Sequence, residues 1–230
     1  MAVKLPAIIV NFKAYEAATG EAAVVLARLH GAVLDGTGAS IGVAVGALDV
    51  TNVLKELKGS PRDASAEVLV FAQHVDPVDF GGRTGHVPAI VAKKAGLYGT
   101  LLNHAERKLD SEVLEQTIRA CREVGLYTIV CAESPEKVAE IAGYGPDAIA
   151  YEPPELIGGN VSVSSAQPEI IRKVVEIAGT VPLLVGAGVK NENDVRVALS
   201  LGAQGVLLAS GVVLSPEPEK VLYNLVDGLS

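Results

Sequence analysis

The sequence has only two cysteines, Cys121 and Cys131, in 230 residues. Two cysteines are too few for a disulfide framework, and their separation is not one that metal sites use. We therefore expect two reduced thiols that are mostly buried, with no redox chemistry and no bound metal.

Long hydrophobic runs and clusters of basic residues are missing as well. No run approaches the ~20 apolar residues of a membrane span, and Met1 is followed by no signal-peptide pattern. The formal net charge is -8, which argues against a protein that binds nucleic acid or anionic membranes. We expect a soluble, cytoplasmic protein that holds any anionic ligand at a local site.

The chain does contain a repeated unit, in which a short aliphatic run is followed by a segment with helical spacing of apolar residues. No linker or change of composition interrupts the eight units, so residues 1–230 are expected to form one domain. The strand-like runs cover residues 5–12, 41–45, 68–73, 98–102, 127–131, 148–151, 181–185 and 205–209.

These runs and the segments between them predict the fold class. Most runs are apolar on both faces, as parallel strands covered on both sides require. Pro168 and Gly179 mark the start and end of one amphipathic helix, Asp110 is expected to cap another, and residues 215–216 to open the last. Eight such units favour an α/β fold of the closed (β/α)₈ barrel type over an open doubly wound sheet.

Polar residues gather at the ends of the predicted strands. Asn11 and Lys13 close the first strand, Asn103 and His104 follow the fourth, and Glu152 follows the sixth. In a parallel barrel these strand ends share one face, where active sites are built. A carboxylate in a partly dry pocket can remove a proton next to a carbonyl, and preorganised donors can stabilise the resulting oxyanion.

Each of these residues also has a simpler interpretation. A glutamate after a strand is more often a solvated loop residue, and a lysine or asparagine there is more often exposed. His74 is the main competitor of His104, whereas His30 and His86 are expected to be structural or exposed. The joint placement of the four residues favours a site over these alternatives.

Two turns of small residues, at 186–188 and 209–211, predict a phosphate site. Small residues leave backbone N–H groups unobstructed, and barrel enzymes often bind phosphate after the seventh and eighth strands. The alternative is that the glycines only permit tight turns.

Five segments, in this order, are similar to the triosephosphate isomerases, and most of all to their compact archaeal members with shortened helices. The resemblance extends along essentially the whole chain. The segments are NFK at 11–13, TLLNHAE at 100–106, YEPPELIG at 151–158, VGAGV at 185–189 and LLASG at 207–211.

The resemblance implies an isomerase that interconverts dihydroxyacetone phosphate and D-glyceraldehyde 3-phosphate through an enediolate, in glycolysis and gluconeogenesis, without a cofactor. It makes Glu152 the base and His104 a neutral electrophile, a pairing for which this family is the standard example. Lys13 and Asn11 would contact the substrate beside them. The implied phosphate contacts, partly in a lid that starts after Glu152, are Asn11, Lys13, Ile157, Gly158, Gly188, Ala209 and Ser210.

The sequence departs from the family pattern at Ala105, where a serine is usual, and in the lid, where residues 158–160 are Gly-Gly-Asn. Neither change affects a proposed catalytic group. Glu106 is expected to form a structural or active-site ion pair. Residues 79–87 resemble the family's third loop, whose threonine, here Thr84, reaches toward a neighbouring subunit, which implies a homotetramer or a dimer.

Two other classes of function remain open from the residues. A lyase or synthase on a related phosphate-binding barrel would share the glycine turns but would not need Asn11, Lys13, His104 and Glu152 together. A non-catalytic binding barrel would tolerate these residues without requiring them. Turnover of glyceraldehyde 3-phosphate would separate the three possibilities.

Overall fold

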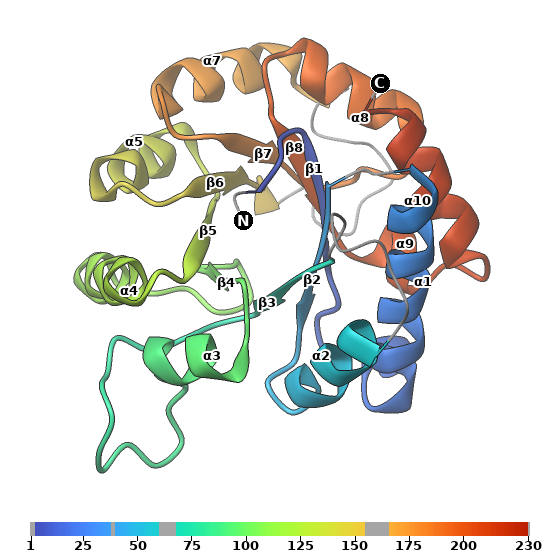
Figure 1. The fold of residues 1–230 in the computed structure, drawn as a ribbon. Coiled ribbons are helices and arrows are strands. Elements are labelled where there is room, and N and C mark those ends of the chain that lie inside the picture. The colour runs from blue at the N-terminus through green and yellow to red at the C-terminus, as the bar shows by residue number, and fades with distance from the viewer. Residues whose placement is uncertain (1–2, 38–39, 60–67, 155–165, 230) are drawn as a thin grey trace.

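The computed structural model describes residues 3–37, 40–59, 68–154 and 166–229, and within them eight parallel strands form a closed barrel. Each strand pairs with its successor, and β1 also pairs with β8, which closes the ring. Figure 1 shows the helices arranged around the outside of these strands. The predicted fold class is therefore confirmed.

All eight predicted strands are present, with ends that differ from the prediction by at most two residues. They are β1 (Ala7–Asn11), β2 (Ser40–Val45), β3 (Leu69–Ala72), β4 (Gly99–Leu102), β5 (Tyr127–Ala132), β6 (Ala148–Tyr151), β7 (Leu183–Val185) and β8 (Gly205–Leu208).

Helices follow the strands, and most are short. They are η1 (Glu16–Ala18), α1 (Glu21–Thr37), α2 (Val50–Gly59), α3 (Ala89–Ala95), α4 (Ser111–Val124), α5 (Pro135–Tyr144), α7 (Pro168–Ala178), α8 (Glu192–Ser200), α9 (Ser210–Val213) and α10 (Pro218–Asp227).

Burial on both faces explains why the strands are continuously apolar. Along β1, Ile9 belongs to the cluster that fills the barrel interior, whereas Ile8 and Val10 belong to the layer between strands and helices. Successive side chains of a strand point to opposite faces, so both faces must be apolar here. The two cysteines are free and buried, as expected.

Two helix predictions need correction. The last helix begins at Pro218, two residues after the predicted Ser-Pro start, because Ser215 Oγ accepts the N–H of Glu217 in a turn that precedes the helix. Asp110 does occupy the N-cap position of α4, but its side chain makes no capping hydrogen bond. The helix from Pro168 to Ala178, followed by Gly179, is as predicted.

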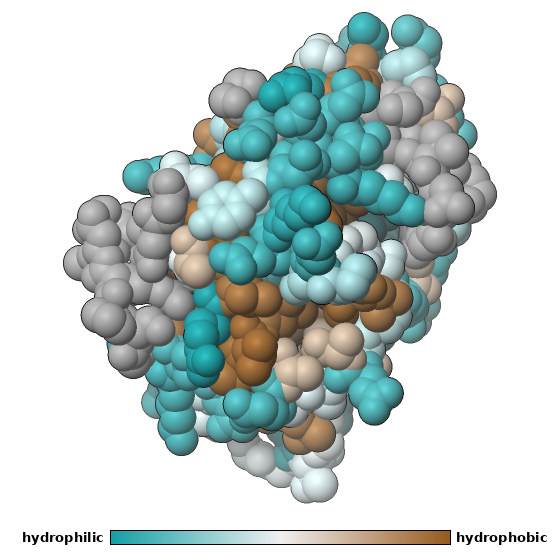
Figure 2. Space-filling view, turned by 90° about the vertical axis from the view of Figure 1, so that its right-hand side faces the viewer, coloured by the Kyte–Doolittle hydropathy of each residue, from teal (hydrophilic) through white to brown (hydrophobic). Residues whose placement is uncertain are grey.

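The outer surface of the helices is mainly polar. Figure 2 shows the side that carries α1 and α10, which is largely hydrophilic with limited apolar areas. Amphipathic helices packed on a barrel leave such a surface. None of the helices within the described ranges is both long enough and apolar enough to span a membrane.

Candidate active site

The carboxyl ends of the strands bring together the four residues that sequence analysis selected. Asn11 is the last residue of β1, and Lys13 follows it with a φ of 50°, a left-handed conformation. His104 lies two residues beyond β4, and Glu152 directly follows β6. Asn11, His104 and Glu152 are buried, so their side chains face the interior of this end of the barrel and not the surrounding water.

Glu152 is a buried carboxylate whose exposed fraction is 7%. Burial raises the pKa of Glu152 to about 7. A hydrogen bond with Cys131 and the positive charge of Lys13 lower this pKa, but their effects are smaller than that of burial. Within the described part of the chain, its Oε2 atom is buried without a hydrogen-bond partner. A carboxylate in this state can accept a proton near neutral pH.

Gly186 at the end of β7 leaves the space that Glu152 occupies. A Cβ atom at this position would lie 2.8 Å from Glu152 Oε1 and 2.6 Å from the carbonyl oxygen of Leu207. Contacts this short are not tolerated, so an alanine here would displace the carboxylate. The first turn of small residues thus positions Glu152 in addition to opening the pocket.

His104 presents one ring nitrogen to Glu152 and the other to the backbone. Its Nδ1 accepts the N–H of Glu106 at 3.2 Å, and its Nε2 lies 3.7 Å from Glu152 Oε2. Since Nδ1 is an acceptor, the proton of the neutral ring is on Nε2. Burial, and then the charge of Lys13, lower the pKa of His104, which favours this neutral form.

Lys13 and Glu106 form an ion pair beside His104, as expected for Glu106. Lys13 Nζ lies 2.7 Å from Glu106 Oε1, and the two side chains are 12% and 58% exposed. Asn11 Oδ1 accepts the backbone N–H of Lys13 at 2.9 Å, which holds the turn between them. The lysine charge is therefore directed into the site by both its backbone and its partner.

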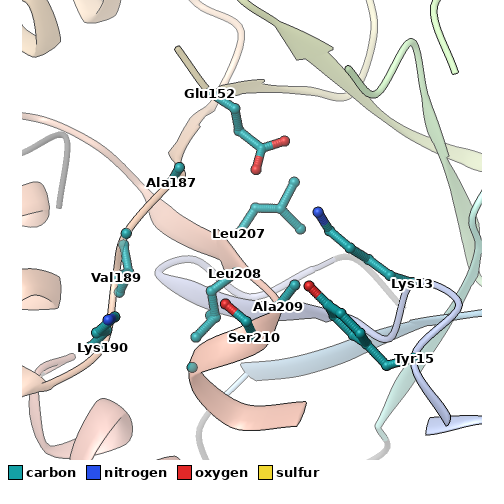
Figure 3. Close-up of a pocket in the computed structure, with 12 residues that line it drawn as sticks. Lys13, Tyr15, Glu152, Ala187, Val189, Lys190, Leu207, Leu208, Ala209 and Ser210 are labelled. Carbon is teal, nitrogen blue, oxygen red and sulfur yellow. The ribbon is translucent and has the colours of Figure 1, made fainter. Parts of the chain in front are cut away.

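A pocket joins Glu152 and Lys13 to the two turns of small residues (Figure 3). Gly188, Ala209 and Ser210, all predicted phosphate contacts, lie in its wall. Ile157 and Gly158, the other two predicted contacts in the lid, lie outside the described residues, as do Gly159 and Asn160. The pocket is lined by Lys13, Tyr15, Glu152, Ala187, Gly188, Val189, Lys190, Leu207, Leu208, Ala209, Ser210 and Gly211.

The other histidines do not approach Glu152 in this way. His74 Nε2 pairs with Asp76 Oδ1 at 3.1 Å, in a neighbouring cavity of about 350 Å³ that also reaches Lys13 and His104. His30 is fully buried in α1, and His86 is exposed. His104 is thus the only histidine of the described residues with an ion-pair-range contact to Glu152.

Comparison with known proteins agrees with this geometry. The sequence matches the family model described as triosephosphate isomerase over residues 6–225. The chain belongs to the triosephosphate isomerase family. It is an isomerase that interconverts dihydroxyacetone phosphate and D-glyceraldehyde 3-phosphate, a step of glycolysis and gluconeogenesis.

Relatives in the family cover nearly the whole chain. Triosephosphate isomerase of Methanopyrus kandleri is 44% identical over 231 residues, covering 99% of each chain. That of Thermoplasma volcanium is 49% identical over 161 residues, which cover 69% of this chain and 76% of the relative. A crystal structure of triosephosphate isomerase from Bartonella henselae has a TM-score of 0.74 at 21% identity, covering 97% of this chain and 98% of the other, and supports the fold.

Two residues at the site of this isomerase were not selected from the sequence, and a third, Asn103, was placed at a strand end without a role. Tyr15 lines the pocket, and Gln73 Nε2 donates to the carbonyl oxygen of Lys13 at 2.9 Å. Asn103 has a φ of 57° and connects Cys131 O, at 2.9 Å, to the N–H of Leu109, at 3.0 Å. Tyr15 lies two residues after the selected Lys13, and Gln73 and Asn103 directly follow β3 and β4. Closeness to a selected residue or to a strand end was the feature of the sequence that could have identified their roles.

Replacing Glu152 by glutamine is expected to stabilise the fold at alkaline pH. A folded-state pKa of about 7, above the ordinary 4.5, means that the folded state binds a proton more tightly than the unfolded chain. The free energy of unfolding therefore falls as pH rises from about 4.5 to 7, by on the order of 3 kcal/mol in total. Glutamine does not titrate, so its variant does not lose this free energy. Denaturant unfolding should therefore show that the free energy of unfolding of the variant increases relative to that of the wild type from pH 4 to pH 8.

Glu140→Gln is the matched control, because hydrogen bonds from Ser111, Lys137 and Tyr144 lower the pKa of Glu140 to about 2. Its ionised form stabilises the fold, and this stabilisation develops between about pH 2 and 4.5. The stability deficit of Glu140→Gln relative to the wild type should therefore stay constant from about pH 4.5 to 8, where Glu152→Gln gains stability. Equal pH dependence of the two variants would contradict the assignment of a raised pKa to Glu152.

Proposed function

We propose that Glu152 is the base of the isomerisation. Its carboxylate takes a proton from the carbon next to the carbonyl of dihydroxyacetone phosphate, and the C–H electrons move to the carbonyl oxygen to give an enediolate. The same group returns the proton to the former carbonyl carbon, while the hydroxyl proton of the first carbon is transferred to the former carbonyl oxygen, which gives glyceraldehyde 3-phosphate. The observation that carries this proposal is a buried carboxylate with a pKa of about 7, the range suited to a base that must accept and release a proton.

His104 and Lys13 stabilise the enediolate in this proposal. The Nε2–H of a neutral His104 lies on the Glu152 side of the ring, so it can donate to the oxygens of a substrate bound between the two residues. Lys13 adds a fixed positive charge, and the amide of Asn11 adds a further donor. Preorganised groups of this kind contribute roughly 3 to 4 kcal/mol each to such a barrier.

The phosphate group occupies the part of the pocket between the two turns of small residues. The amides of Ser210 and Gly211 begin α9 and have no carbonyl one turn earlier to bond with. By contrast, the Lys190 N–H is already donated to Asp194 Oδ2 at 2.9 Å. Gly188, Ala209 and Ser210, with Lys13 on the opposite side, therefore form the proposed anion site, completed by Ile157 and Gly158 of the lid.

A coupled assay tests this function most simply. Purified protein should convert glyceraldehyde 3-phosphate to dihydroxyacetone phosphate, detected by its NADH-dependent reduction, with no added metal or cofactor. A lyase or synthase would consume the substrate without forming dihydroxyacetone phosphate, and a binding protein would leave it unchanged. We place the enzyme in the cytoplasm, where the other steps of glycolysis occur.

We also propose that the enzyme is a homo-oligomer, a tetramer or a dimer, in which residues 79–87 of one copy reach the active site of another. Figure 1 shows the segment between β3 and α3 extending away from the barrel. Residues 79–86 are exposed, Phe80 to 59%. The cavity of about 350 Å³ beside His104 and Glu106 is the proposed receiving site for Thr84 of the second copy.

Leu48 provides a test of this assembly. It is 94% exposed and adjoins Ala47, which lines the receiving cavity. Leu48→Glu should therefore fold normally but place a charge in the proposed interface. The molar mass measured by light scattering should then fall from that of the wild-type oligomer to that of smaller oligomers or monomers. Activity at low protein concentration should fall by roughly tenfold, because ~1.4 kcal/mol of lost interface stability changes a dimer equilibrium that much.

Leu214→Glu is the control, since Leu214 is 55% exposed at the end of α9, away from the loop and the cavity. The Leu214→Glu variant should keep the association between subunits that residues 79–87 are proposed to make. A wild-type enzyme that is fully active as a monomer would exclude the proposed assembly.

A further inference from the structure

Tyr15 lies in the wall of the proposed phosphate site, although no role in the reaction has been assigned to it so far. It lines the same pocket as Lys13, Glu152, Gly188 and Ser210. Figure 3 shows its ring rising from the loop after β1, with the hydroxyl group directed into the pocket beside Ala209 and Ser210. The hydroxyl thus lies on the wall of the pocket opposite Ala187 and Val189.

The loop around Tyr15 is well fixed. The Tyr15 carbonyl oxygen accepts the N–H of Ala18 and the hydroxyl of Thr19, both at 2.9 Å. Tyr15 also occupies the N-cap position of η1, and its partly buried ring packs against the hydrophobic core. A tyrosine held in this way loses little further freedom when a ligand binds, so its hydroxyl is a preorganised donor.

A phosphate group bound in this pocket needs hydrogen-bond donors on several sides. A phosphate dianion has three outer oxygens to satisfy, and the proposed site offers them backbone amides on one side and the Lys13 ammonium on another. A tyrosine hydroxyl can donate to a charged oxygen, which gives a stronger hydrogen bond than a neutral acceptor does.

We propose that the Tyr15 hydroxyl donates a hydrogen bond to the phosphate group of the bound triose phosphate. The proposal rests on the phosphate site inferred above and assigns to Tyr15 a direct substrate contact. It gives the first loop two functions, since Lys13 serves the reacting oxygen and Tyr15, two residues later, serves only the phosphate. The alternative is that the ring merely packs against the core and the hydroxyl is incidental.

Tyr15→Phe removes the hydroxyl and keeps the ring. For glyceraldehyde 3-phosphate, KM should rise roughly tenfold, while kcat changes by less than about threefold. The inhibition constant of inorganic phosphate should rise by a similar factor. With D-glyceraldehyde, which has the same reacting carbons but no phosphate, kcat/KM should be unchanged. Tyr223→Phe, on the exposed face of α10, is the control and should alter none of these values.

A second measurement does not depend on the variant. In protein with ¹³C-labelled tyrosine, titration with inorganic phosphate should shift the ring signal of Tyr15 and leave that of Tyr223 in place. Unchanged KM in a folded Tyr15→Phe protein, an equal loss with both substrates, or an unmoved Tyr15 signal would each overturn the proposal. A wild-type protein without isomerase activity would instead overturn the proposed function.

Discussion

Replacing Glu152 by glutamine is expected to lower kcat by about 10³-fold, within the range of ~10² to 10⁴ that general-base catalysis contributes. Glutamine has nearly the same shape and fills the space beside Gly186, so the fold and the pocket should be retained. The amide cannot accept a proton from carbon, and the reaction loses its first step. Steady-state kinetics with inorganic phosphate as a competitive inhibitor would separate this loss from any loss of binding.

Glu152→Asp is the second arm of this test. It keeps the charge but withdraws the carboxylate by about one methylene group, and a misplacement near 1 Å can cost ~10²-fold in rate. In the wild type, kcat/KM should rise with pH up to about 7, the pKa of Glu152, and level off above it. Near-normal turnover in a folded glutamine variant would remove Glu152 from the role of base.

Replacing Lys13 by methionine is expected to reduce kcat/KM by at least 10³-fold. Methionine retains most of the length of the side chain but removes the charge that faces both the reacting oxygen and the phosphate, and each such interaction is worth on the order of 3 kcal/mol. It also leaves Glu106 without its partner at 2.7 Å. Since the charge of Lys13 helps to lower the pKa of His104, the variant should shift the histidine signal in NMR titration to higher pH.

Lys108→Met is the matched control for this variant. Lys108 forms an ion pair of the same length, 2.7 Å, with Glu133, but its side chain is 51% exposed. Surface pairs of this kind contribute little, so kcat/KM should change by less than about twofold. If both methionine variants kept their activity, the charge of Lys13 would have no part in catalysis.

The barrel could be predicted from the sequence because its strands obey a strong physical constraint. A parallel strand covered by helices outside and by other strands' side chains inside must be apolar on both faces, and β1 shows this with Ile8, Ile9 and Val10 all buried. Helix starts were less certain. Ser215 and Pro216 have the composition of a helix start, but Pro218 satisfies the same requirement two residues later.

The catalytic candidates could be predicted because strand ends of a parallel barrel converge whatever the loops do. Glu152, His104 and Lys13 are more than 40 residues apart in sequence, yet His104 Nε2 lies 3.7 Å from Glu152 Oε2 and the charge of Lys13 acts on both residues. The raised pKa of Glu152 could not be predicted, since it depends on how completely the surrounding side chains exclude water. Residue type alone does not determine burial.

The roles of residues that act through loop conformation were beyond prediction. Tyr15 enters the pocket only because Lys13 adopts a φ of 50° and η1 follows at once. Asn103, at a φ of 57°, connects β5 to the loop that carries His104. A positive φ at a residue other than glycine is uncommon and leaves no reliable pattern in sequence.

Isomerisation in D₂O tests the central claim most directly, because a proton held on Glu152 exchanges with solvent during turnover. NMR of the product formed from dihydroxyacetone phosphate should show deuterium at the carbon next to the carbonyl of glyceraldehyde 3-phosphate with the wild type. With Glu152→Gln, neither product nor deuterated substrate should accumulate on the same time scale. Product free of deuterium would indicate direct hydrogen transfer between the two carbons and would contradict proton abstraction by Glu152.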